Sequence, residues 1–588
     1  MSDKPVVIIG AGPGGLAAAY ELSREGIQPI VIEKADTVGG ISRTETFKEY
    51  YFDMGGHRFF TKMERINRIW HEMLGDEFLK VSRISRIYYK GRFYDYPLRM
   101  FKTFFNLGPL ESLLILLSYF KVQLLPYTEE VNFEQWVTNR FGRRLFRTFF
   151  KTYTEKVWGI PCHQIKSDWA AQRIKGLSLI VAVSNALIGT QNAKSLINTF
   201  NYPLKGPGMM WQRFSETIEA EGGQVRLNSA VVRLRHDKGR IVSVSCHKDD
   251  ETEEILNGHV ISSIPISQIV TLLEPKAPDK VLEAAQNLSY RAFIIVVLIL
   301  NKKNLFPDQW IYIHSPEVKV GRIQNFKNWS AAMVPDSQKT SIGMEYFCNV
   351  GDDIWTKPDT ELTDMAAQEL LELGLAEIDD ITDRVVVRQP YAYPVYDQDY
   401  EKHLKVIRNY LRNIDDFQTI GRNGMHRYNN MDHSMQTGIK AAQNVMGANH
   451  DLWRINDEDE YHEVAEKREP WQILTEKALI LTFTRMDKLA FATAIGSVSG
   501  LLFFIATIWL IIKDGRVIGP FLQLLSQYFI GYTVTVKGAF IALGYSFIWG
   551  FLFGWLFAYI RNLMFAFYIY LVKKKSDILT FKDFFDHF

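Results

Sequence analysis

The feature that most constrains this fold is a glycine-rich turn between an apolar strand and a helix near the start of the chain. Residues 5–10 (PVVIIG) predict a buried strand, the next glycines form the pattern GxGxxG, and an alanine-rich helix is expected through Glu25. A second apolar strand at 29–34 carries Glu33 near its end. In such a unit the glycines permit a tight turn and close approach of a pyrophosphate, and the acidic residue binds a ribose. The pattern predicts a Rossmann-type dinucleotide site made by Gly10, Gly12, Gly14, Gly15, Glu33 and Lys34.

The charge balance excludes one large class of function. Lys and Arg number 68 and Asp and Glu 66, so the formal net charge is +2. Proteins that bind nucleic acid need a clustered surplus of positive charge, so no nucleic-acid partner is expected. The cysteines at 162, 246 and 348 lie far apart without a CxxC pattern, and we expect neither a disulfide framework nor a metal site.

The pattern up to about residue 480 is typical of an α/β protein. Strands are expected at 224–229, 241–247, 259–265 and around 293–301, and helices should dominate between 63 and 220. The predicted fold class is α/β, a Rossmann-type domain with inserted substrate domains and a C-terminal helical transmembrane hairpin. The expected parts are a dinucleotide domain (1–62, 205–275 and 415–450), a helical substrate or cap domain (63–204), a sheet-containing substrate domain (276–414), a linker (451–488) and a membrane anchor (489–575).

Two long uncharged segments near the C-terminus predict the anchor. Residues 489–512 and 538–560 contain no charged side chain, and about 20 apolar residues span a bilayer core. A buried core helix is the alternative reading. Lysines and arginines flank the pair on its outer sides, including Lys488 and Arg561, which favours both termini in the cytoplasm. We therefore expect an integral protein of the cytoplasmic membrane, with its catalytic domain facing the cytoplasm.

A third apolar segment, 107–126, is interrupted by Glu111 and Lys121. Its composition fits a helix lying on a membrane surface. It fits a core helix of the middle of the chain equally well, and the sequence leaves both readings open.

Two further motifs point to the identity of the dinucleotide. Residues 33–44 (EKADTVGGISRT) carry a second glycine pair, and residues 420–442 contain another glycine turn before an expected helix. Both segments resemble the FAD-binding signatures of flavoproteins of the amine oxidase and protoporphyrinogen oxidase type. The resemblance implies FAD as the cofactor, with contacts from Gly40, Arg43, Gly421, Arg422, Asn430, Met431 and Asp432.

The middle of the chain resembles one branch of that superfamily. Residues 151–161 (KTYTEKVWGIP) nearly match the FKGYTEKQWG motif of UDP-galactopyranose mutases, and segments 55–61, 391–395 and 421–432 resemble other mutase motifs in the same order. The chain departs from the family at Phe60, where the mutases have a second histidine, and in its membrane hairpin. The resemblance implies His57 at the flavin, Arg173 and Arg322 on a diphosphate, and Tyr153, Trp158, Tyr393 and Tyr428 around the sugar.

The resemblance implies an FAD-dependent pyranose/furanose mutase. In such enzymes the reduced flavin N5 forms an adduct with the sugar and displaces its diphosphate, without net redox change. The expected substrate is a nucleotide sugar or a lipid-linked glycosyl diphosphate used in cell-surface polysaccharide synthesis. The alternatives are an oxidoreductase that dehydrogenates a membrane-associated substrate and a non-enzymatic flavin-binding scaffold. A homodimer is compatible with the sequence.

Overall fold

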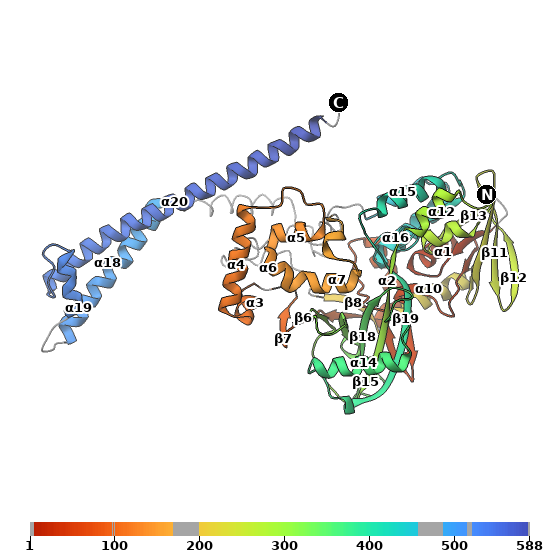
Figure 1. Cartoon of the computed structure of the whole chain (residues 1–588), viewed down its shortest axis with the longest axis horizontal. Helices are drawn as coiled ribbons and strands as arrows, with labels where there is room; N and C mark the ends of the chain where they lie inside the picture. Colours follow the sequence, from red (N-terminus) through yellow and green to blue (C-terminus); the bar gives the residue numbers. More distant parts are fainter. Residues whose placement is uncertain are drawn as a thin grey trace. The chain divides into compact units, whose positions relative to one another are not determined.

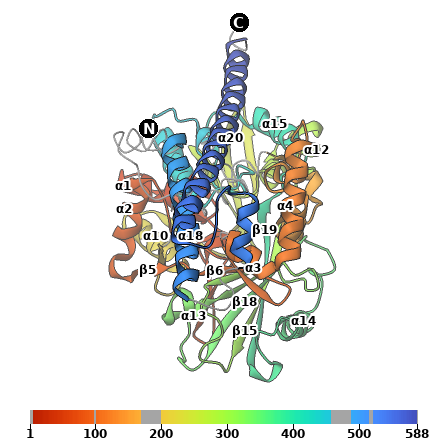
Figure 2. The same ribbon diagram turned by 90° about the vertical axis from the view of Figure 1, so that its left-hand side faces the viewer.

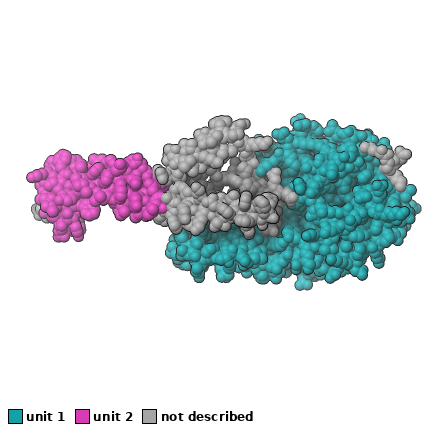
Figure 3. Space-filling model, turned by 90° about the horizontal axis from the view of Figure 1, so that it is seen from above, with its two compact units in different colours: residues 1–465 teal, residues 466–588 magenta. Residues whose placement is uncertain are grey.

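The chain divides into two units, Met1–Ala465 and Glu466–Phe588, which Figure 3 shows in separate colours. The structure is a computed structural model, and the residues that it describes are 5–96, 98, 100–167, 199–456, 486–513 and 520–585. The first unit contains all the sheets and the second contains two long helices.

A parallel five-stranded sheet forms the dinucleotide-binding part of the first unit. Its strand order is β20 (Phe417–Thr419), β13 (His259–Ser262), β1 (Val6–Ile9), β2 (Pro29–Ile32) and β9 (Gln224–Arg226). Every neighbouring pair is parallel. The strands come from three separate stretches of chain, so residues near 10, 260 and 420 meet at one edge of the sheet. The fold is the mixed α/β fold that the glycine pattern predicted.

Both faces of this sheet are covered, because alternate side chains of a strand point to opposite faces. Ile8 and Val31 pack with one group of helices, α1 (Pro13–Arg24), α2 (Glu64–Leu74), α10 (Gly208–Ala220) and α16 (Met431–Val445). Val7 and Ile9 pack on the opposite side. That side is covered by α11 (Ile266–Ile269), α12 (Asp279–Gln286), α15 (Tyr400–Leu411) and a four-stranded sheet in the order β12 (Glu251–Leu256), β11 (Arg240–Lys248), β10 (Ala230–Asp237) and β14 (Leu273–Glu274).

A seven-stranded sheet forms the second large layer. Its order is β19 (Ile381–Pro394), β15 (Tyr290–Leu300), β18 (Thr340–Cys348), β17 (Arg322–Asn325), β16 (Trp310–Ile313), β6 (Ser85–Tyr89) and β7 (Arg92–Asp95). Strand β15 is buried on both faces, which explains its continuous apolar sequence. Ile294 and Val296 pack toward α14 (Asp359–Glu372), while Phe293 and Ile295 pack toward the candidate site.

Helices dominate the described part of residues 63–220, as expected, but this region also contributes strands. Strands β5 (Phe78–Ser82), β6 and β7 lie within it, and β6 joins the same sheet as β16. The reason is a hairpin turn at Lys90 and Gly91, whose positive φ angles of 49° and 73° suit the twist of paired strands. One sheet therefore links residues 85–95 to the predicted substrate domain at 276–414. Two small strand pairs complete the unit, β3 (Thr44–Phe47) with β4 (Tyr50–Asp53) and β5 with β8 (Thr199–Pro203).

The helices of the predicted cap lie together at one end of the first unit (Figure 1). They are α3 (Met100–Leu107), α4 (Pro109–Leu124), α5 (Phe133–Phe141), α6 (Arg143–Phe146), the π-helical turn η3 (Arg147–Lys151) and α7 (Thr152–Trp158). Their inward faces share a single aromatic-rich core with Phe293 and Ile295 of the seven-stranded sheet. The cap is thereby packed directly against the sheet that carries the candidate site.

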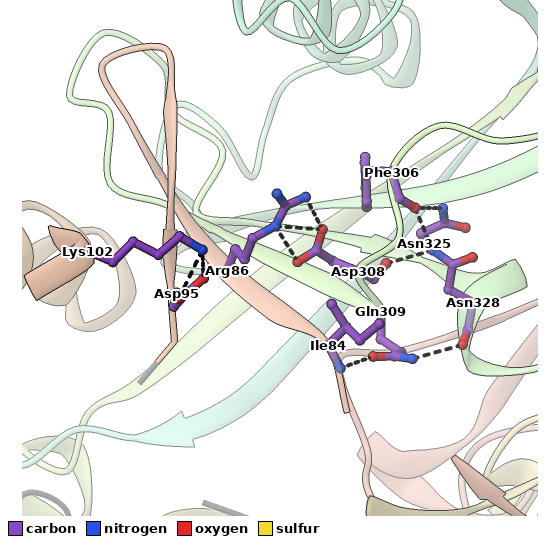
Figure 4. A network of polar contacts seen from close by, with 9 residues as sticks. All are labelled: Ile84, Arg86, Asp95, Lys102, Phe306, Asp308, Gln309, Asn325 and Asn328. Carbon is purple, nitrogen blue, oxygen red and sulfur yellow. Dashed lines mark hydrogen bonds and ion pairs between the residues drawn. The ribbon is translucent and has the colours of Figure 1, made fainter. Parts of the chain in front are cut away.

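Polar contacts fix the β6–β7 hairpin to its surroundings (Figure 4). Arg86 donates to both carboxylate oxygens of the buried Asp308, with Nη2 to Oδ2 at 2.6 Å. The side chain of Gln309 accepts from the Ile84 amide at 2.7 Å and donates to the Asn328 carbonyl at 3.2 Å. Because the Asp308 carboxylate is fully buried and needs its charged partner, this network holds the hairpin in one register.

The second unit is an antiparallel pair of helices, α18 (Lys488–Lys513) and α20 (Val536–Phe585), which lie side by side in Figure 2, with the short helix α19 (Pro520–Gln523) between them in sequence. Helix α18 and residues 536–563 of α20 are long and apolar enough to cross a membrane, with mean hydropathies of 2.3 and 1.7. The helices approach closely at small residues: a β-carbon on Gly550 would lie 3.0 Å from the Gly496 Cα, and one on Gly500 would lie 2.9 Å from the Leu543 carbonyl oxygen. Closely spaced glycines in both helices are typical of membrane helix pairs.

Candidate active site

The turn between β1 and α1 forms an open cradle. Gly10 has a φ of 97° and donates its amide to the Ile32 carbonyl at 2.8 Å, which makes the turn tight. A β-carbon on Gly15 would lie 1.9 Å from the Gly10 carbonyl oxygen, so α1 packs directly on the strand. A β-carbon on Gly12 would meet no atom within 4 Å, and Gly12 gives the start of α1 no side-chain cap. The open space and the helix N-terminus together fit a pyrophosphate.

Glu33 lies at the edge of this cradle. Its carboxylate accepts the Ala11 amide at 2.8 Å and the Ala35 amide at 2.9 Å, which fixes both oxygens beside the glycine turn. A carboxylate in this place can still accept from ribose hydroxyls through its remaining lone pairs. Lys34 is exposed next to it.

The second glycine pair lies on the first. Gly39 and Gly40 both have positive φ, and Gly39 donates its amide to the Ala11 carbonyl at 2.8 Å. A β-carbon on Gly40 would lie 3.3 Å from the Gly12 Cα, so the two turns enclose the same space. Arg43 is bonded to the Gly40 carbonyl (3.1 Å), to Glu45 (2.6 Å) and to Gln389 of β19 (2.6 Å), and it links the cradle to the seven-stranded sheet.

Helix α16 reaches the cradle by packing on α1. A β-carbon on Gly14 would lie 3.1 Å from the Ser434 carbonyl oxygen and 3.5 Å from the Gly421 Cα, and one on Gly438 would lie 2.0 Å from the Gly14 carbonyl oxygen. Gly14 thus has a packing role between the two helices besides its place in the motif. The crossing sets Gly421, Asn430, Met431 and Asp432 at the end of α16 nearest the glycine turn.

Three aromatic rings from distant parts of the chain meet beyond the cradle. Tyr393 and Tyr428 stack with centroids 5.7 Å apart and ring planes at 15°. Trp158 at the end of α7 lies 6.4 Å from each. The guanidinium of Arg422 lies 4.8 Å from the centroid of the Tyr428 ring and 5.7 Å from that of Tyr393. The sequence assigned Arg422 to the cofactor, whereas the structure places it against the rings assigned to the substrate.

Arg422 is held by neutral groups. Its Nε donates to the Asn429 carbonyl at 2.9 Å and its Nη1 to the Ala392 carbonyl at 3.4 Å. Within the described ranges no carboxylate forms an ion pair with it. Its positive charge is therefore available to an anionic ligand.

Arg322, by contrast, is already paired. Its Nε and Nη2 donate to the Glu345 carboxylate at 2.9 and 2.5 Å, and Gln324 donates to the same carboxylate at 2.7 Å. Burial alone would lower the pKa of Arg322, but the negative charge of Glu345 raises it well above its ordinary value. The sequence analysis missed Glu345. It is the one charged residue of the fully buried strand β18, and that isolated charge is the signal that could have revealed it.

His57 and Tyr153 complete the cluster. A β-carbon on Gly55 would lie 3.7 Å from both the His57 Nε2 and the Arg322 Nη2. These two groups therefore both lie close to the backbone at Gly55. His57 Nε2 bonds the Met54 carbonyl at 2.9 Å, and burial lowers the pKa of His57 to about 4, which keeps it neutral at pH 7. Tyr153 stacks on His314 with centroids 4.9 Å apart, and burial raises its pKa well above the ordinary value. Arg173 lies outside the described residues.

Three buried histidines predict a loss of stability in acid. Burial lowers the pKa of His57 and His426 to about 4 and that of His314 to about 3. Below pH 6.5 the unfolded chain therefore binds protons that the folded chain excludes, and each pKa unit of difference is worth about 1.4 kcal/mol. Asp53 and Glu369 act in the opposite direction, because burial raises the pKa of Asp53 to about 7 and also raises that of Glu369. Burial lowers the pKa of the partly buried His259, which adds to the effect of the three histidines.

We expect the free energy of unfolding to fall steeply between pH 6.5 and 4 in urea titrations. The variant His426→Gln keeps a donor for the Val395 carbonyl but cannot titrate. Its free energy of unfolding should therefore fall less over this pH interval than that of the natural protein. Stability that stays constant or rises over this interval would contradict the neutral, buried state of these histidines.

Comparison with known proteins agrees with this geometry. The family model described as flavin containing amine oxidoreductase matches residues 13–446. The crystal structure of a reduced UDP-galactopyranose mutase superposes with a TM-score of 0.68 at 22% identity, covering 78% of this chain and 98% of the mutase. A putative protoporphyrinogen oxidase from Exiguobacterium superposes with a TM-score of 0.58 at 17% identity, covering 76% of this chain and all of that one. At these identities the superpositions define the fold.

Sequence relatives match over shorter stretches. Amine oxidase B of Sus scrofa is 39% identical over 121 residues, which is 19% of this chain and 23% of the oxidase. An L-amino-acid oxidase of Crotalus adamanteus is 41% identical over 83 residues, 14% of this chain and 15% of that enzyme. The matches thus span about a quarter or less of the relatives' length. With the cradle described above, the family match identifies FAD as the cofactor.

Proposed function

Because the chain belongs to the family of flavin-containing amine oxidoreductases, with 13–446 as the matching region, we propose that it is an FAD-dependent mutase that interconverts the ring forms of a sugar carried on a diphosphate. The observation that carries this proposal is the position of Arg422. A guanidinium without a carboxylate partner among the described residues lies against the stacked rings of Tyr393 and Tyr428. Such a site binds an anion next to a flat, partly apolar group.

The site's own residues suit the tasks of such a reaction. A guanidinium donates two parallel hydrogen bonds to phosphate oxygens, so Arg422 can hold a diphosphate while its bond to the sugar breaks. Trp158 and Tyr393 are 3% and 8% exposed and shield the sugar from water. The hydroxyls of Tyr153 and Tyr393 remain protonated donors near neutral pH, because burial raises the pKa of Tyr153 well above its ordinary value and that of Tyr393 to about 12.

The pairing of Arg322 with Glu345 limits the role of Arg322. The single N–H of Nε and one N–H of Nη2 donate to Glu345, so only Nη1 and the second N–H of Nη2 are left for a ligand. We propose that Arg322 orients the ligand and that Arg422 supplies the main charge for the diphosphate. Bound FAD in its reduced form would supply the electron pair that allows a sugar bond to break and re-form without net oxidation.

Oxidation of a membrane-associated substrate is the second candidate. It is favoured by the family match and by relatives named as amine and L-amino-acid oxidases. The two functions differ in what happens to flavin absorbance and to the product. A mutase converts a sugar diphosphate into a ring isomer of the same mass, and only after dithionite has reduced the flavin. An oxidase bleaches oxidised flavin when substrate is added without oxygen, and its product has lost two hydrogens. Isomer formation supports our proposal, and anaerobic bleaching would replace it with the second candidate.

Substitution of Arg422 tests the site assignment. We expect Arg422→Gln to retain FAD and to raise the KM for a sugar diphosphate roughly 10- to 100-fold, because charge-assisted hydrogen bonds contribute about 1.5–3 kcal/mol. The KM of Arg422→Lys should lie between those of Arg422→Gln and the natural protein, since lysine keeps the charge but loses the paired donors. Arg412→Gln is the matched control, an exposed arginine at the end of α15. Loss of FAD from Arg422→Gln would instead place this residue at the cofactor, as the sequence predicted.

We further propose that α18 and α20 anchor the enzyme in the cytoplasmic membrane with the first unit in the cytoplasm. Support comes from their length, their hydropathy and their contact through Gly496, Gly500 and Gly550. Most of their large apolar side chains, Trp509 and Phe553 among them, are exposed on the helix pair. Resistance of the full chain to alkaline extraction from membranes is expected, and release by alkaline buffer would contradict the anchor. An anchored enzyme suits a lipid-linked glycosyl diphosphate.

A further inference from the structure

Helix α4 carries an exposed apolar stripe on the first unit. Leu110, Leu113, Leu117, Phe120 and Leu124 are spaced three or four residues apart and therefore share one side of the helix. Their side chains are 71, 54, 55, 60 and 82% exposed, respectively. Ile115 and Tyr119, on the opposite side, are almost fully buried. The helix thus has one apolar side in the core and a second apolar side with no protein group of the described chain covering it.

The exposed area extends beyond α4 to its two neighbours. Phe105 of α3 is 87% exposed and Leu125, just after α4, is 75% exposed. We use the term α4 face for the seven residues Phe105, Leu110, Leu113, Leu117, Phe120, Leu124 and Leu125. In Figure 1 this helix lies at the outer end of the cap. A contiguous group of large apolar side chains on a protein surface marks an interaction site.

The α4 face is held in place by the structure around it. Ser112 donates to the Phe104 carbonyl at 2.8 Å, which joins the start of α4 to α3. The Arg144 amide donates to Ser118 at 3.1 Å, and α6 packs close to Tyr119 through Gly142. Lys102 of α3 pairs with Asp95 at the end of β7, and β6–β7 is fixed by the polar network already described (Figure 4). The apolar stripe is therefore presented by a fixed helix.

Basic side chains outnumber acidic ones in the segment that carries the α4 face. Residues 100–151 contain seven lysines and arginines and four acidic residues. Lys121 lies on α4 itself. Arg143 is exposed on α6, which packs on α4, and Arg147 and Lys151 are exposed on η3, which follows α6. Glu111 is neutralised by Arg144, with two hydrogen bonds of 2.6 Å. Arg140 and Arg143 pair with Glu130 and Glu134, which leaves Lys121, Arg147 and Lys151 as the excess positive charge of this segment.

We propose that the α4 face of the first unit binds the surface of an anionic lipid bilayer. Leucine and phenylalanine on one side of a helix with lysine and arginine around it are the chemistry of an interfacial helix, whose apolar side enters the acyl boundary while cations contact lipid phosphates. A bilayer is also the apolar phase that this chain meets if α18 and α20 span a membrane. The proposal concerns a different surface from the anchor, and it does not depend on the reaction that the site catalyses.

The position of α4 gives this contact a consequence for the substrate. The buried side of α4, at Ile115 and Tyr119, belongs to the same hydrophobic core as Trp158 and Tyr393 of the candidate site. Contact of α4 with lipid would therefore place the cap that packs on the site against the bilayer surface. A sugar diphosphate on a lipid carrier presents its phosphates at that surface.

The test uses the full chain in lipid nanodiscs. The three natural cysteines are buried, so a cysteine introduced at the surface can be labelled selectively with an environment-sensitive fluorophore. Leu117→Cys places the probe in the α4 face, and Glu283→Cys places it on the exposed side of α12 as the matched control. We expect the probe at 117 to shift to the blue and to be quenched at least about threefold more strongly by nitroxide lipids than the probe at 283, in discs with about one third phosphatidylglycerol. In phosphatidylcholine discs at high salt the difference should shrink.

A second variant separates lipid contact from other causes. In Leu113→Glu/Phe120→Glu, which leaves the candidate site untouched, the probe at 117 should return to the emission of an exposed site while FAD content stays unchanged. Equal, solvent-like emission at 117 and 283 in anionic discs would overturn the proposal. A blue shift that persists without lipid and grows with protein concentration would also overturn it, because the α4 face would then be an interface between two copies of the chain.

Discussion

Replacing Gly12 by valine is expected to leave a folded protein that no longer retains FAD. Gly12 has φ −77° and ψ 179°, which valine adopts without strain, and a β-carbon there meets no protein atom within 4 Å. The added methyl groups would occupy the space of the pyrophosphate, so FAD affinity should fall at least about 100-fold, or about 2.7 kcal/mol. Flavin absorbance after desalting measures retention, and circular dichroism measures folding.

A neighbouring glycine supplies the contrast. Gly15→Ala adds a single carbon 1.9 Å from the Gly10 carbonyl oxygen and 3.3 Å from Ile8, where the nearest atom is backbone. This variant should be destabilised by about 3 kcal/mol or more, because α1 must move off the strand. If Gly12→Val retained FAD with natural affinity, the assignment of the cradle to the pyrophosphate would be wrong. Gly15→Ala with natural stability would show that there is room for an added carbon between α1 and β1.

The second large effect is expected at the pair formed by Arg322 and Glu345. Arg322→Ala leaves a fully buried carboxylate whose remaining described donor is Gln324, and loss of one partner of a buried ion pair costs about 3–5 kcal/mol. The midpoint of urea unfolding should fall accordingly, with the slope unchanged. Activity should fall as well, because Gly55 and His57 pack against the same guanidinium.

The double variant distinguishes pairing from simple loss of volume. Arg322→Met/Glu345→Met removes both charges, so it should be clearly more stable than Arg322→Ala. Its activity should stay as low as that of Arg322→Ala, because the guanidinium that orients the ligand is absent from both variants, whereas Arg422 is still present. Arg384→Ala is the control: it breaks an ion pair with the largely exposed Asp364, and such pairs contribute about 0–1 kcal/mol. If Arg322→Ala and Arg384→Ala lowered the free energy of unfolding equally, burial would not account for the contribution of the Arg322–Glu345 pair.

Local patterns were sufficient to predict the dinucleotide part of the fold. The strand, glycine turn, helix and terminal acid at 5–33 form the predicted unit, because each of these features acts between residues close in sequence. The apolar run around 293–301 correctly predicted β15. The same reasoning missed the β6–β7 hairpin, although Lys90 and Gly91 form a recognisable turn between alternating residues.

The candidate site depended on more than local pattern. Tyr153, Trp158, Tyr393 and Tyr428 were singled out by their motifs, and the structure brings them together with His57 and Arg322. The different environments of the two arginines could not be predicted. Arg322 is paired because β17 and β18 align it opposite Glu345, a register that no motif encodes.

The sequence by itself determined the cofactor fold and the presence of two membrane-length helices, because a nucleotide-binding turn and a hydrophobic span are written in consecutive residues. Only the tertiary structure decided which arginine carries a free charge and which side of α4 remains uncovered. Pairing and burial depend on contacts that no local motif encodes, such as the ion pair of Arg322 with Glu345 on the neighbouring strand, or the contact of Trp158 with Tyr428, 270 residues later in the chain. Those contacts are selected by sheet register and helix packing, which form only when the whole chain folds.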